Sequence, residues 1–267
     1  MIHRNGIASI RNVSLRSIRV WQRNADVWRT TWLTNFIPPL LEPVLYILAF
    51  GLGMGRLIGV VTYQGIELPY LRFMIPGIIS VAIMFWAYFE TTYSSFVRMY
   101  YQKTFDGIMA TPLLAEDVIA GEWLWGATKS VLAATIMLGM VGSFGLLSWP
   151  TGLLVIPLAL IGGMLFSGIG LISTALVPKI DSFNLPIFII VFPMFLFSGT
   201  FFPIDILPAW AMKVALTLPL THISFLVRGA CLGVLPNIWI WSVAYLILGT
   251  LVSSTLAVIL MKRRLVK

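Results

Sequence analysis

The sequence contains little charge: Asp, Glu, Lys and Arg make up 10% of its residues, against about 25% in an average soluble domain. It also contains a single cysteine, Cys231, and two histidines, His3 and His222. One cysteine excludes a disulfide framework and a multi-cysteine metal site, and two distant histidines do not match zinc-ligand spacing. We therefore expect neither a disulfide nor a metal site in this chain.

The longest uncharged run extends from position 130 to position 178. At ~1.5 Å per residue, one helix of that length would measure about 74 Å, more than twice the ~30 Å hydrocarbon thickness of a bilayer. Two helices that turn near positions 148–151 account for it, whereas a chain of 267 residues cannot bury such a run in a soluble core. A membrane β-barrel would show short segments of alternating hydrophobicity instead. With 59% hydrophobic residues, the sequence predicts an all-α polytopic membrane protein.

Six apolar segments are long enough to cross a bilayer as helices. They lie at positions 32–55, 73–96, a segment that ends near Trp149, 153–177, 183–202 and 238–261. Six spans put both termini on one side, where fourteen of the 18 Lys and Arg residues would lie. The positive-inside rule makes that side cytoplasmic, so we expect a multi-pass protein of a bacterial cytoplasmic (inner) membrane with both termini in the cytoplasm. The net charge of +8 does not indicate a nucleic-acid partner, because the basic residues lie along the membrane edges rather than in one stripe.

Residues 1–31 precede the first span and carry six arginines. These are Arg4, Arg11, Arg16, Arg19, Arg23 and Arg29. On a helical wheel they fall within an arc of ~140°, opposite an arc of Ile, Val and Trp side chains. The pattern predicts an amphipathic helix in the cytoplasmic headgroup region. A mitochondrial transit peptide is also rich in Arg and poor in acids, but the tryptophans and the span that follows at once favour the interfacial helix.

The remainder, 32–267, is predicted to form one six-span transmembrane domain. Residues 203–233 interrupt its apolar pattern before the last span. The apolar pieces at 209–218 and 223–231 are too short to cross a membrane, and Pro219 separates them. We predict a pair of re-entrant or interfacial half-helices, broken near Pro219, on the outer side.

No catalytic constellation is present in the sequence. The stretch from Gly121 to Ser130 superficially resembles a phosphate-binding loop. Such a loop needs a glycine directly before its lysine, whereas two residues separate Gly126 from Lys129 and no strand is predicted before it. We therefore expect that the chain itself binds no ATP and no other cofactor.

Two acidic residues, Glu42 and Glu90, lie within predicted spans. A carboxylate in the hydrocarbon region costs on the order of 2.5 kcal/mol or more, so it normally faces a protein interior or a cavity. Each could form part of a substrate pathway or a proton site. Each could also be structural, paired with Arg98 or Lys129 or hydrogen-bonded to a neighbouring helix.

The predicted cytoplasmic loop 98–117 contains a short amphipathic helix. Phe105, Ile108 and Met109 fall at i, i+3 and i+4, Thr104 can cap the helix, and Pro112 ends it. An apolar stripe outside the bilayer suits a contact with a partner protein, with Phe105 as its aromatic anchor. The alternative is a helix that merely lies on the membrane.

Several separate segments resemble the type-two ABC exporter permeases, and among them the permeases that export lipo-oligosaccharide signals. The segments are EPVLY at 42–46, FGLGMG at 50–55, FETTYSSFVRM at 89–99, ATPLLAEDVIAGE at 110–122, SGTFFPIDILP at 198–208, LPLTHI at 218–223 and KRRL at 262–265. They cover nearly the whole chain in the family's order. These matches indicate the superfamily specifically, but they indicate the identity of the exported cargo less specifically.

The resemblance implies a permease that homodimerises and binds two copies of a separate ATPase subunit, where ATP and Mg²⁺ would act. It implies an amphipathic, lipid-like or lipo-oligosaccharide cargo that leaves across the membrane, in contact with membrane lipid. The resemblance places the contact with the ATPase at the short cytoplasmic helix. It places the cargo pathway along the spans and the outer segments. The coupling residues would be Thr104, Phe105, Asp106, Ile108 and Met109, and the pathway residues Glu42, Glu90, Phe202 and His222.

Three alternatives remain open. Sister permeases with the same scaffold export drugs and other hydrophobic compounds. A lipid-modifying intramembrane enzyme would need a polar cluster at one depth, which Asp205, His222 and Arg228 could supply. A proton-coupled carrier could use Glu42, although no inverted repeat is visible.

Overall fold

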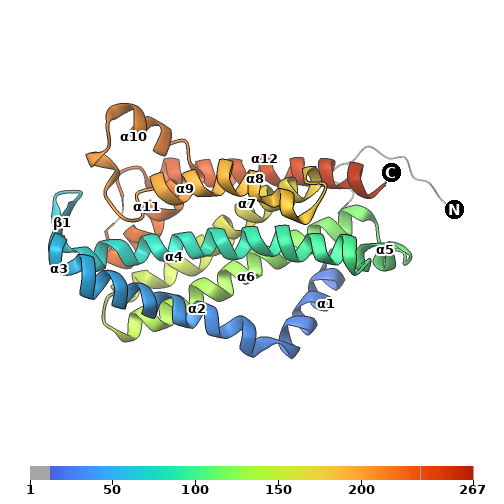
Figure 1. Cartoon of the computed structure of the whole chain (residues 1–267), viewed down its shortest axis with the longest axis horizontal. Coiled ribbons are helices and arrows are strands. Elements are labelled where there is room, and N and C mark those ends of the chain that lie inside the picture. The colour runs from blue at the N-terminus through green and yellow to red at the C-terminus, as the bar shows by residue number, and fades with distance from the viewer. Residues whose placement is uncertain (1–12, 235, 267) are drawn as a thin grey trace.

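The computed structural model describes residues 13–234 and 236–266 (Figure 1). Within these ranges six helical segments are long and apolar enough to cross a membrane, which confirms the predicted class. From span one to span six they are Trp32–Gly51, Tyr70–Tyr101, Ala115–Ser143, Thr151–Leu176, Ile180–Phe197 and Trp239–Leu265. Of the expected N-terminal helix, α1 begins at Ser17, and the described residues 13–16 before it are not helical. Residues 1–12, with Arg4 and Arg11, lie outside the described ranges.

The spans consist of α-helices with shorter π- and 3₁₀-helical segments between them. The α-helices are α1 (Ser17–Thr30), α2 (Trp32–Tyr46), α3 (Gly55–Ile58), α4 (Tyr70–Phe89), α5 (Thr104–Met109), α6 (Ala115–Ser143), α7 (Val155–Leu176), α8 (Asn184–Pro186), α9 (Phe192–Phe197), α10 (Ala209–Ala215), α11 (Pro219–Leu232) and α12 (Trp239–Leu265). The π-helical segments are Ile47–Met54, Glu90–Ser94, Val97–Tyr101 and Ile187–Val191. The 3₁₀-helical segments are Thr151–Leu154, Ile180–Phe183 and Ile204–Ile206.

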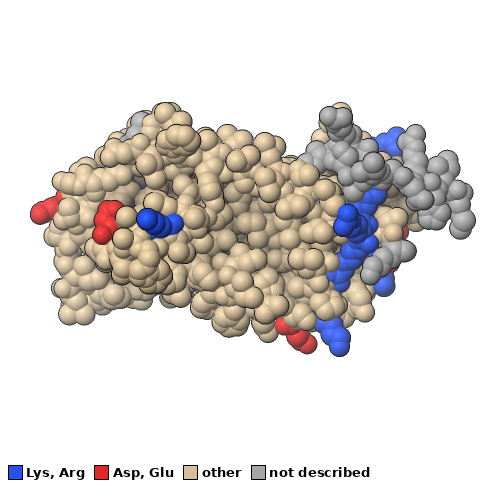
Figure 2. Space-filling model, turned by 90° about the horizontal axis from the view of Figure 1, so that it is seen from above, with Lys and Arg blue, Asp and Glu red and all other residues tan. Residues whose placement is uncertain are grey.

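The bundle has two chemically different ends. One carries α1, α5 and the last turn of α12, and we call it the basic end (Figure 1). The other carries a β-hairpin with α10 and α11, and we call it the hairpin end. On the face seen in Figure 2, Lys and Arg gather mainly at the basic end, and a wide belt without charge separates the two ends. This distribution is typical of a protein whose middle lies in hydrocarbon.

The spans differ greatly in how much of their apolar surface the chain itself buries. In the most apolar stretch of span two 78% of the residues are buried, against 11% in span one and 17% in span five. Span two is therefore the centre of the described chain. Spans one and five present most of their apolar side chains to lipid or to another protein.

Spans three and four pack closely because small residues face each other. A Cβ built on Gly163 in α7 would lie 2.0 Å from Ser130 Oγ and 3.1 Å from Ala127 Cα in α6. The Ser130 hydroxyl also donates to the carbonyl oxygen of Ala159 at 3.0 Å. Only a glycine fits at this helix crossing without displacing the Ser130 side chain or the neighbouring helix.

Before span six the chain turns sharply, as the proline pattern predicts. Helices α10 and α11 meet at 84°, and Pro219 is the first residue of α11, where its missing N–H costs no helical hydrogen bond. Helix α11 is almost entirely buried, although it is too short to span a bilayer. The predicted bent helix pair is therefore present at the hairpin end.

The hairpin between spans one and two was not predicted from the sequence. Strands β1 (Val60–Tyr63) and β2 (Ile66–Pro69) pair antiparallel, with Tyr63 opposite Ile66. The two connecting residues, Gln64 and Gly65, have φ values of 49° and 78°. Positive φ at both central positions is the signature of a type I′ turn.

Candidate transport and coupling sites

Glu90 lies at the start of the π-helical segment Glu90–Ser94 in span two. Its Oε1 accepts hydrogen bonds from Arg98 Nη1 at 2.8 Å and from Trp125 Nε1 at 3.1 Å. Lys129 Nζ lies 4.0 Å from Glu90 Oε2. Both basic residues named as structural partners of Glu90 therefore contact it.

Arg98 joins this carboxylate to a second one, Glu122, in α6. Arg98 Nε and Nη2 donate to Glu122 Oε2 at 3.0 and 2.5 Å. The other oxygen of Glu122 accepts from Asn24 Nδ2 of α1 at 2.8 Å. The Glu122 side chain is 1% exposed, so this chain of contacts attaches α1 to spans two and three through a buried ion pair.

Lys129 extends the contacts to span one. Its ammonium donates to Asn35 Oδ1 of α2 and lies 5.4 Å from the ring centroid of Trp86. The side chain of Trp86 in turn interacts with the half-buried Glu42. We call the set Asn24, Asn35, Glu42, Trp86, Glu90, Arg98, Glu122, Trp125 and Lys129 the polar network.

Glu90, Arg98 and Glu122 of the network lie near the membrane surface. Glu90 is twenty residues beyond Tyr70, the start of span two, which is about 30 Å along a helix and equals the thickness of the hydrocarbon core. Arg98 and Glu122 follow at the same end of the bundle. Glu42, in contrast, lies in the middle of span one.

A row of aromatic rings runs from this end of span two toward the hairpin end. Neighbouring ring centroids are 5.2–6.0 Å apart, and every ring in the row is half-buried. The row consists of Tyr93, Phe89 and Phe85 of span two, Phe195 of span five, Phe201 in the turn that follows, and Phe50 and Tyr46 of span one. Glu90 follows Phe89, and Glu42 precedes Tyr46 by one helical turn. The row thus offers apolar ring faces, with the carboxylate of Glu90 near its span-two end and that of Glu42 near its span-one end.

The other two predicted pathway residues, Phe202 and His222, lie at the hairpin end, apart from the network. Phe202 is half-buried in the turn after α9. His222 is 7% exposed and stacks on Tyr245, with ring centroids 4.3 Å apart. His222 Nε2 lies 3.0 Å from the carbonyl oxygen of Leu216 and Nδ1 lies 3.0 Å from Ser242 Oγ. A carbonyl accepts only, so Nε2 carries the proton and Nδ1 accepts from the serine.

Arg228 is the largest fully buried side chain in the described chain. Its Nε donates to the carbonyl oxygen of Phe73 at 3.1 Å and its Nη2 to that of Gly199 at 2.8 Å. The guanidinium lies 4.0 Å from the ring centroid of Phe73 and 5.2 Å from that of Tyr63. Arg228 therefore ties α11, span two, the hairpin and the turn after span five together.

These contacts do not support the lipid-modifying enzyme. Among the described residues, no hydrogen bond or salt bridge joins Asp205, His222 and Arg228. The polar groups of His222 and Arg228 are occupied by separate structural partners instead.

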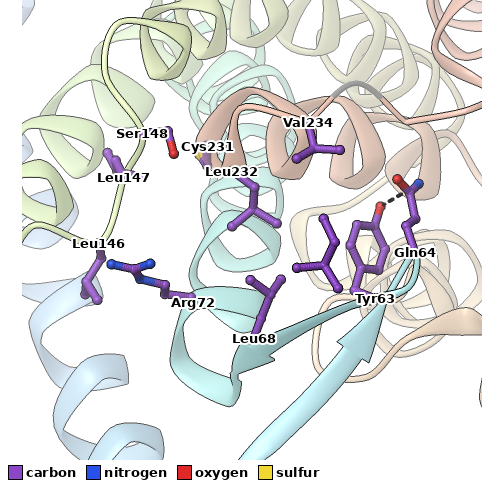
Figure 3. A pocket seen from close by; sticks show the side chains of 11 residues that line it. Tyr63, Gln64, Leu68, Arg72, Leu146, Leu147, Ser148, Cys231, Leu232 and Val234 are labelled. Carbon is purple, nitrogen blue, oxygen red and sulfur yellow. Dashed lines mark hydrogen bonds between the residues drawn. The ribbon is translucent and has the colours of Figure 1, made fainter.

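A small pocket lies beside the hairpin, between β2, the turn after α6 and the end of α11 (Figure 3). Its volume is about 130 Å³, and aliphatic side chains such as Leu68, Leu146 and Leu232 line most of it. The hydroxyl of Tyr63 accepts a 3.5 Å hydrogen bond from Gln64 Nε2 at its edge, and burial raises the pKa of Tyr63. The pocket is too small for a lipid-sized cargo.

The short helix predicted in the loop 98–117 is present as α5, but its orientation differs from the expectation. Phe105 is fully buried and packs in a cluster with Phe96, Val118, Phe183 and other core side chains. The prediction that Phe105 presents its ring to a partner is therefore wrong. The apolar stripe of α5 packs against the bundle, because the extended ends of spans two and three reach beyond the hydrocarbon and cover it.

The exposed surface of α5 consists of polar and small residues. Asp106 and Gly107 are exposed, whereas Thr104, Ile108 and Met109 are half-buried. Thr104 does not cap the helix: the N-cap residue is Lys103, which has a φ of 55°, and no side-chain cap is present. A groove of about 340 Å³ separates α5 from Arg19, Val20 and Arg23 of α1.

Helix α1 docks on span three through contacts that its arginine pattern does not reveal. Val20 fits against Gly121, where a Cβ would lie 2.5 Å from Val20 Cβ. The Ser14 hydroxyl and N–H donate to Asp117 Oδ1 at 2.9 and 2.7 Å, and Trp21 Nε1 donates to Thr128 Oγ1 at 2.9 Å. The buried face of α1 is Ser17, Val20 and Asn24, which is narrower and more polar than the predicted apolar arc.

The fold and the charge distribution define a multi-pass helical membrane protein. A family model described as ABC-2 type transporter matches residues 17–232. Nodulation protein J of Rhizobium leguminosarum bv. viciae is 34% identical over 228 residues, which cover 85% of this chain and 86% of the relative. Nodulation protein J of Rhizobium meliloti (strain 1021) is 32% identical over 81% of each chain. The inner membrane transport permease YadH of Escherichia coli (strain K12) is 25% identical over 83% of this chain and 84% of its own.

The chain belongs to the ABC-2 type transporter family. It is the membrane-spanning permease subunit of an exporter, without an ATPase of its own, and ATP is used at a partner ATPase subunit. This agrees with the resemblance noted from the sequence segments.

Proposed function

We propose that this permease exports an amphipathic lipo-oligosaccharide. The observation that carries the proposal is the half-buried aromatic row with Glu42 and Glu90 beside it. Aromatic faces suit the apolar faces of sugar rings and acyl chains, and carboxylates accept hydrogen bonds from sugar hydroxyl and amide groups. The similarity to nodulation protein J supports the same class of cargo. In this proposal Glu42, Glu90, Phe202 and His222 lie along the pathway or at its exit.

The proposed working unit is a homodimer with two copies of the ATPase subunit, at which ATP and Mg²⁺ act. Spans one and five leave most of their apolar residues uncovered, as a span that faces a second copy would. The aromatic row lies on the half-buried side of span two, between these spans. A second copy would thus convert an open row into an enclosed pathway.

The basic end is proposed to face the cytoplasm of a bacterial inner membrane. The basic residues concentrated there support this orientation. The ATPase would then contact the exposed surface of α5 and the neighbouring groove along α1, with Asp106 as a polar contact. Thr104, Phe105, Ile108 and Met109 would hold α5 in place, so that Phe105 positions the coupling helix without touching the ATPase.

The test is ATP hydrolysis by the purified permease–ATPase complex in lipid vesicles. A lipo-chitooligosaccharide should stimulate hydrolysis, and the same oligosaccharide without its acyl chain should not. Phe85→Ala should raise the half-maximal cargo concentration about fivefold, which corresponds to ~1 kcal/mol for a lost ring contact. Trp241→Ala, which removes a 77% exposed ring of α12 outside the row, serves as the control. If hydrophobic drugs stimulated ATP hydrolysis and the lipo-chitooligosaccharide did not, the alternative function, export of drugs, would be favoured.

A further inference from the structure

Helices α1 and α2 meet at an angle at the basic end (Figure 1). A second pocket is lined by residues of α1, α2, span two and α6. We call it the elbow pocket. Its volume is about 390 Å³, and its walls come from α1, α2, the π-helical end of span two and α6. The residues that matter for its chemistry are Arg23, Trp28, Glu90, Arg98, Trp125 and Lys129.

The pocket lies at the depth of lipid headgroups. Span one starts at Trp32, with one residue between it and the end of α1 at Thr30, and Glu90 lies about 30 Å from the other end of span two. Tryptophans such as Trp28 and Trp125 are the side chains that favour this depth. The pocket therefore borders the layer in which lipid phosphates lie.

Its charges do not balance. Three cationic groups, Arg23, Arg98 and Lys129, line the pocket with one carboxylate, Glu90. Glu122 lies behind them and contributes one more negative charge, in its ion pair with Arg98. One positive charge is left over, which equals the charge of a single phosphodiester.

The excess charge is concentrated on Arg23 and Lys129. Arg23 forms no salt bridge with any described carboxylate, and its Nη1 donates only to the neighbouring Asn24 Oδ1 at 2.9 Å. Burial, and then repulsion from Arg98, lower the pKa of the Arg23 guanidinium. Lys129 is 6% exposed and reaches a carboxylate only at 4.0 Å. Both cations have spare donors that a phosphate could accept from.

We propose that the elbow pocket binds the phosphodiester headgroup of an anionic lipid of the adjacent leaflet. Arg23 and Lys129 contact the phosphate, and the acyl chains follow the exposed apolar side of α2 into the hydrocarbon. The bound lipid stabilises α1 against spans two and three. It is a resident lipid, so the inference holds whichever cargo the permease moves.

The test is native mass spectrometry of the full-length chain in detergent, with phosphatidylglycerol or phosphatidylcholine added. Phosphatidylglycerol should be retained preferentially. Arg23→Gln should weaken its binding about fivefold, which corresponds to ~1 kcal/mol for one basic residue near the membrane surface. Arg23→Lys should restore most of the binding. Lys129→Gln should weaken binding similarly, provided that its elution profile shows folded protein.

The matched control is Arg263→Gln, which removes the same charge from an exposed position of α12 at the same end, outside the pocket. It should leave binding within about twofold of the parent, as expected for a distant screened charge. Equal retention of the two lipids, or equal effects of Arg23→Gln and Arg263→Gln, would overturn the proposal. Glycerophosphoglycerol, the same headgroup without acyl chains, should compete poorly. If it bound as tightly as the intact lipid, the pocket would take a free phosphodiester and the lipid assignment would be wrong.

Discussion

Glu42 and Glu90 are both acids within spans, but they occupy different surroundings. Glu90 accepts hydrogen bonds from Arg98 and Trp125 and lies 4.0 Å from Lys129. Glu42 interacts with the side chain of Trp86 and forms no salt bridge with any described residue. Removing the charge of Glu90 leaves Lys129 without a nearby carboxylate and Arg98 with Glu122 alone, whereas removing that of Glu42 breaks no described salt bridge.

We therefore predict that Glu90→Gln chiefly lowers stability, whereas Glu42→Gln chiefly lowers transport. Glu90→Gln should lower the free energy of unfolding by about 3 kcal/mol, as expected when one member of a buried ion pair is lost. Glu42→Gln should change it by about 0.5 kcal/mol or less while it lowers transport, if its carboxylate contacts the cargo. The measurements are thermal unfolding of the purified chain and cargo transport normalised to folded protein. Equal losses of folded protein and transport in both variants would contradict a pathway role for Glu42.

At the scale of elements, α5 has one face buried against the bundle and one exposed face. Phe105→Ala should lower the free energy of unfolding by about 3 kcal/mol or more, because it leaves a cavity among Phe96, Val118 and Phe183. Asp106→Lys should leave stability within about 0.5 kcal/mol, because the side chain is exposed. The same variant should reduce the amount of ATPase that co-purifies with the permease.

The control for Asp106→Lys is Glu67→Lys, which makes the same kind of charge reversal on the exposed hairpin at the opposite end. It should retain the ATPase. Loss of ATPase in both variants would indicate a general charge effect. Retention in both would remove the exposed face of α5 from the coupling contact.

The crossing of α6 and α7 gives a prediction about packing. Gly163→Ala places a methyl group 2.0 Å from Ser130 Oγ, so the helices must separate or the serine must lose its bond to Ala159. We expect a loss of about 2 kcal/mol in the free energy of unfolding, typical of overpacking. The control is Gly139→Ala in α6, the helix that carries Ser130. No atom outside the helix backbone lies within 4 Å of its new methyl group, so this variant should be neutral or stabilising. Similar thermal unfolding of both variants would contradict the close contact.

The long elements were predictable because hydrocarbon imposes a length and a composition on them. The six spans and the break at Pro219 follow from apolar runs and a proline. The docking face of α1 could not be predicted, because Ser17 and Asn24 are polar and their partners lie in α6. Phe105 was misjudged because a position outside the bilayer does not reveal that the ends of spans two and three cover it. The hairpin did leave a signal, since Gln64-Gly65 separates two short β-branched and apolar runs.

The same limit applies to the candidate sites. Sequence alone gave Arg98 or Lys129 as structural partners for Glu90, as one of two open interpretations, because charged residues in spans are few and are normally paired. Glu122 was missed as a network member because Glu116 and Asp117 lie in the first turn of the same helix, so a third acid near them does not stand out in the sequence. The aromatic row was missed because it combines residues of three separate segments, whose neighbourhood only the fold defines.

At the scale of the whole molecule, span two connects the basic end, where we propose that the ATPase binds, with the hairpin end. Span two is the most buried span, carries Glu90, Arg98 and three of the seven rings of the aromatic row, and contacts Arg228 through the carbonyl of Phe73. Its two π-helical segments, Glu90–Ser94 and Val97–Tyr101, lie next to α5 and the network. Such segments are common at functional sites, so this end of span two is where we expect movement of α5 to be transmitted.

The orientation of the molecule gives the last prediction. If the basic end is cytoplasmic, exposed residues of the hairpin end must be reachable from outside the cell. Cysteine at Thr62 in β1 or at Lys213 in α10, both exposed, should react with a membrane-impermeant maleimide in intact cells. Cysteine at Gly107 in α5 should react only after the membrane is permeabilised. The parent chain should stay unlabelled in intact cells, because its native Cys231 is 1% exposed, and replacing Cys231 by serine in each variant removes any remaining background. Labelling at Gly107 in intact cells, with Thr62 and Lys213 protected, would reverse the topology and exclude α5 as the contact for a cytoplasmic ATPase.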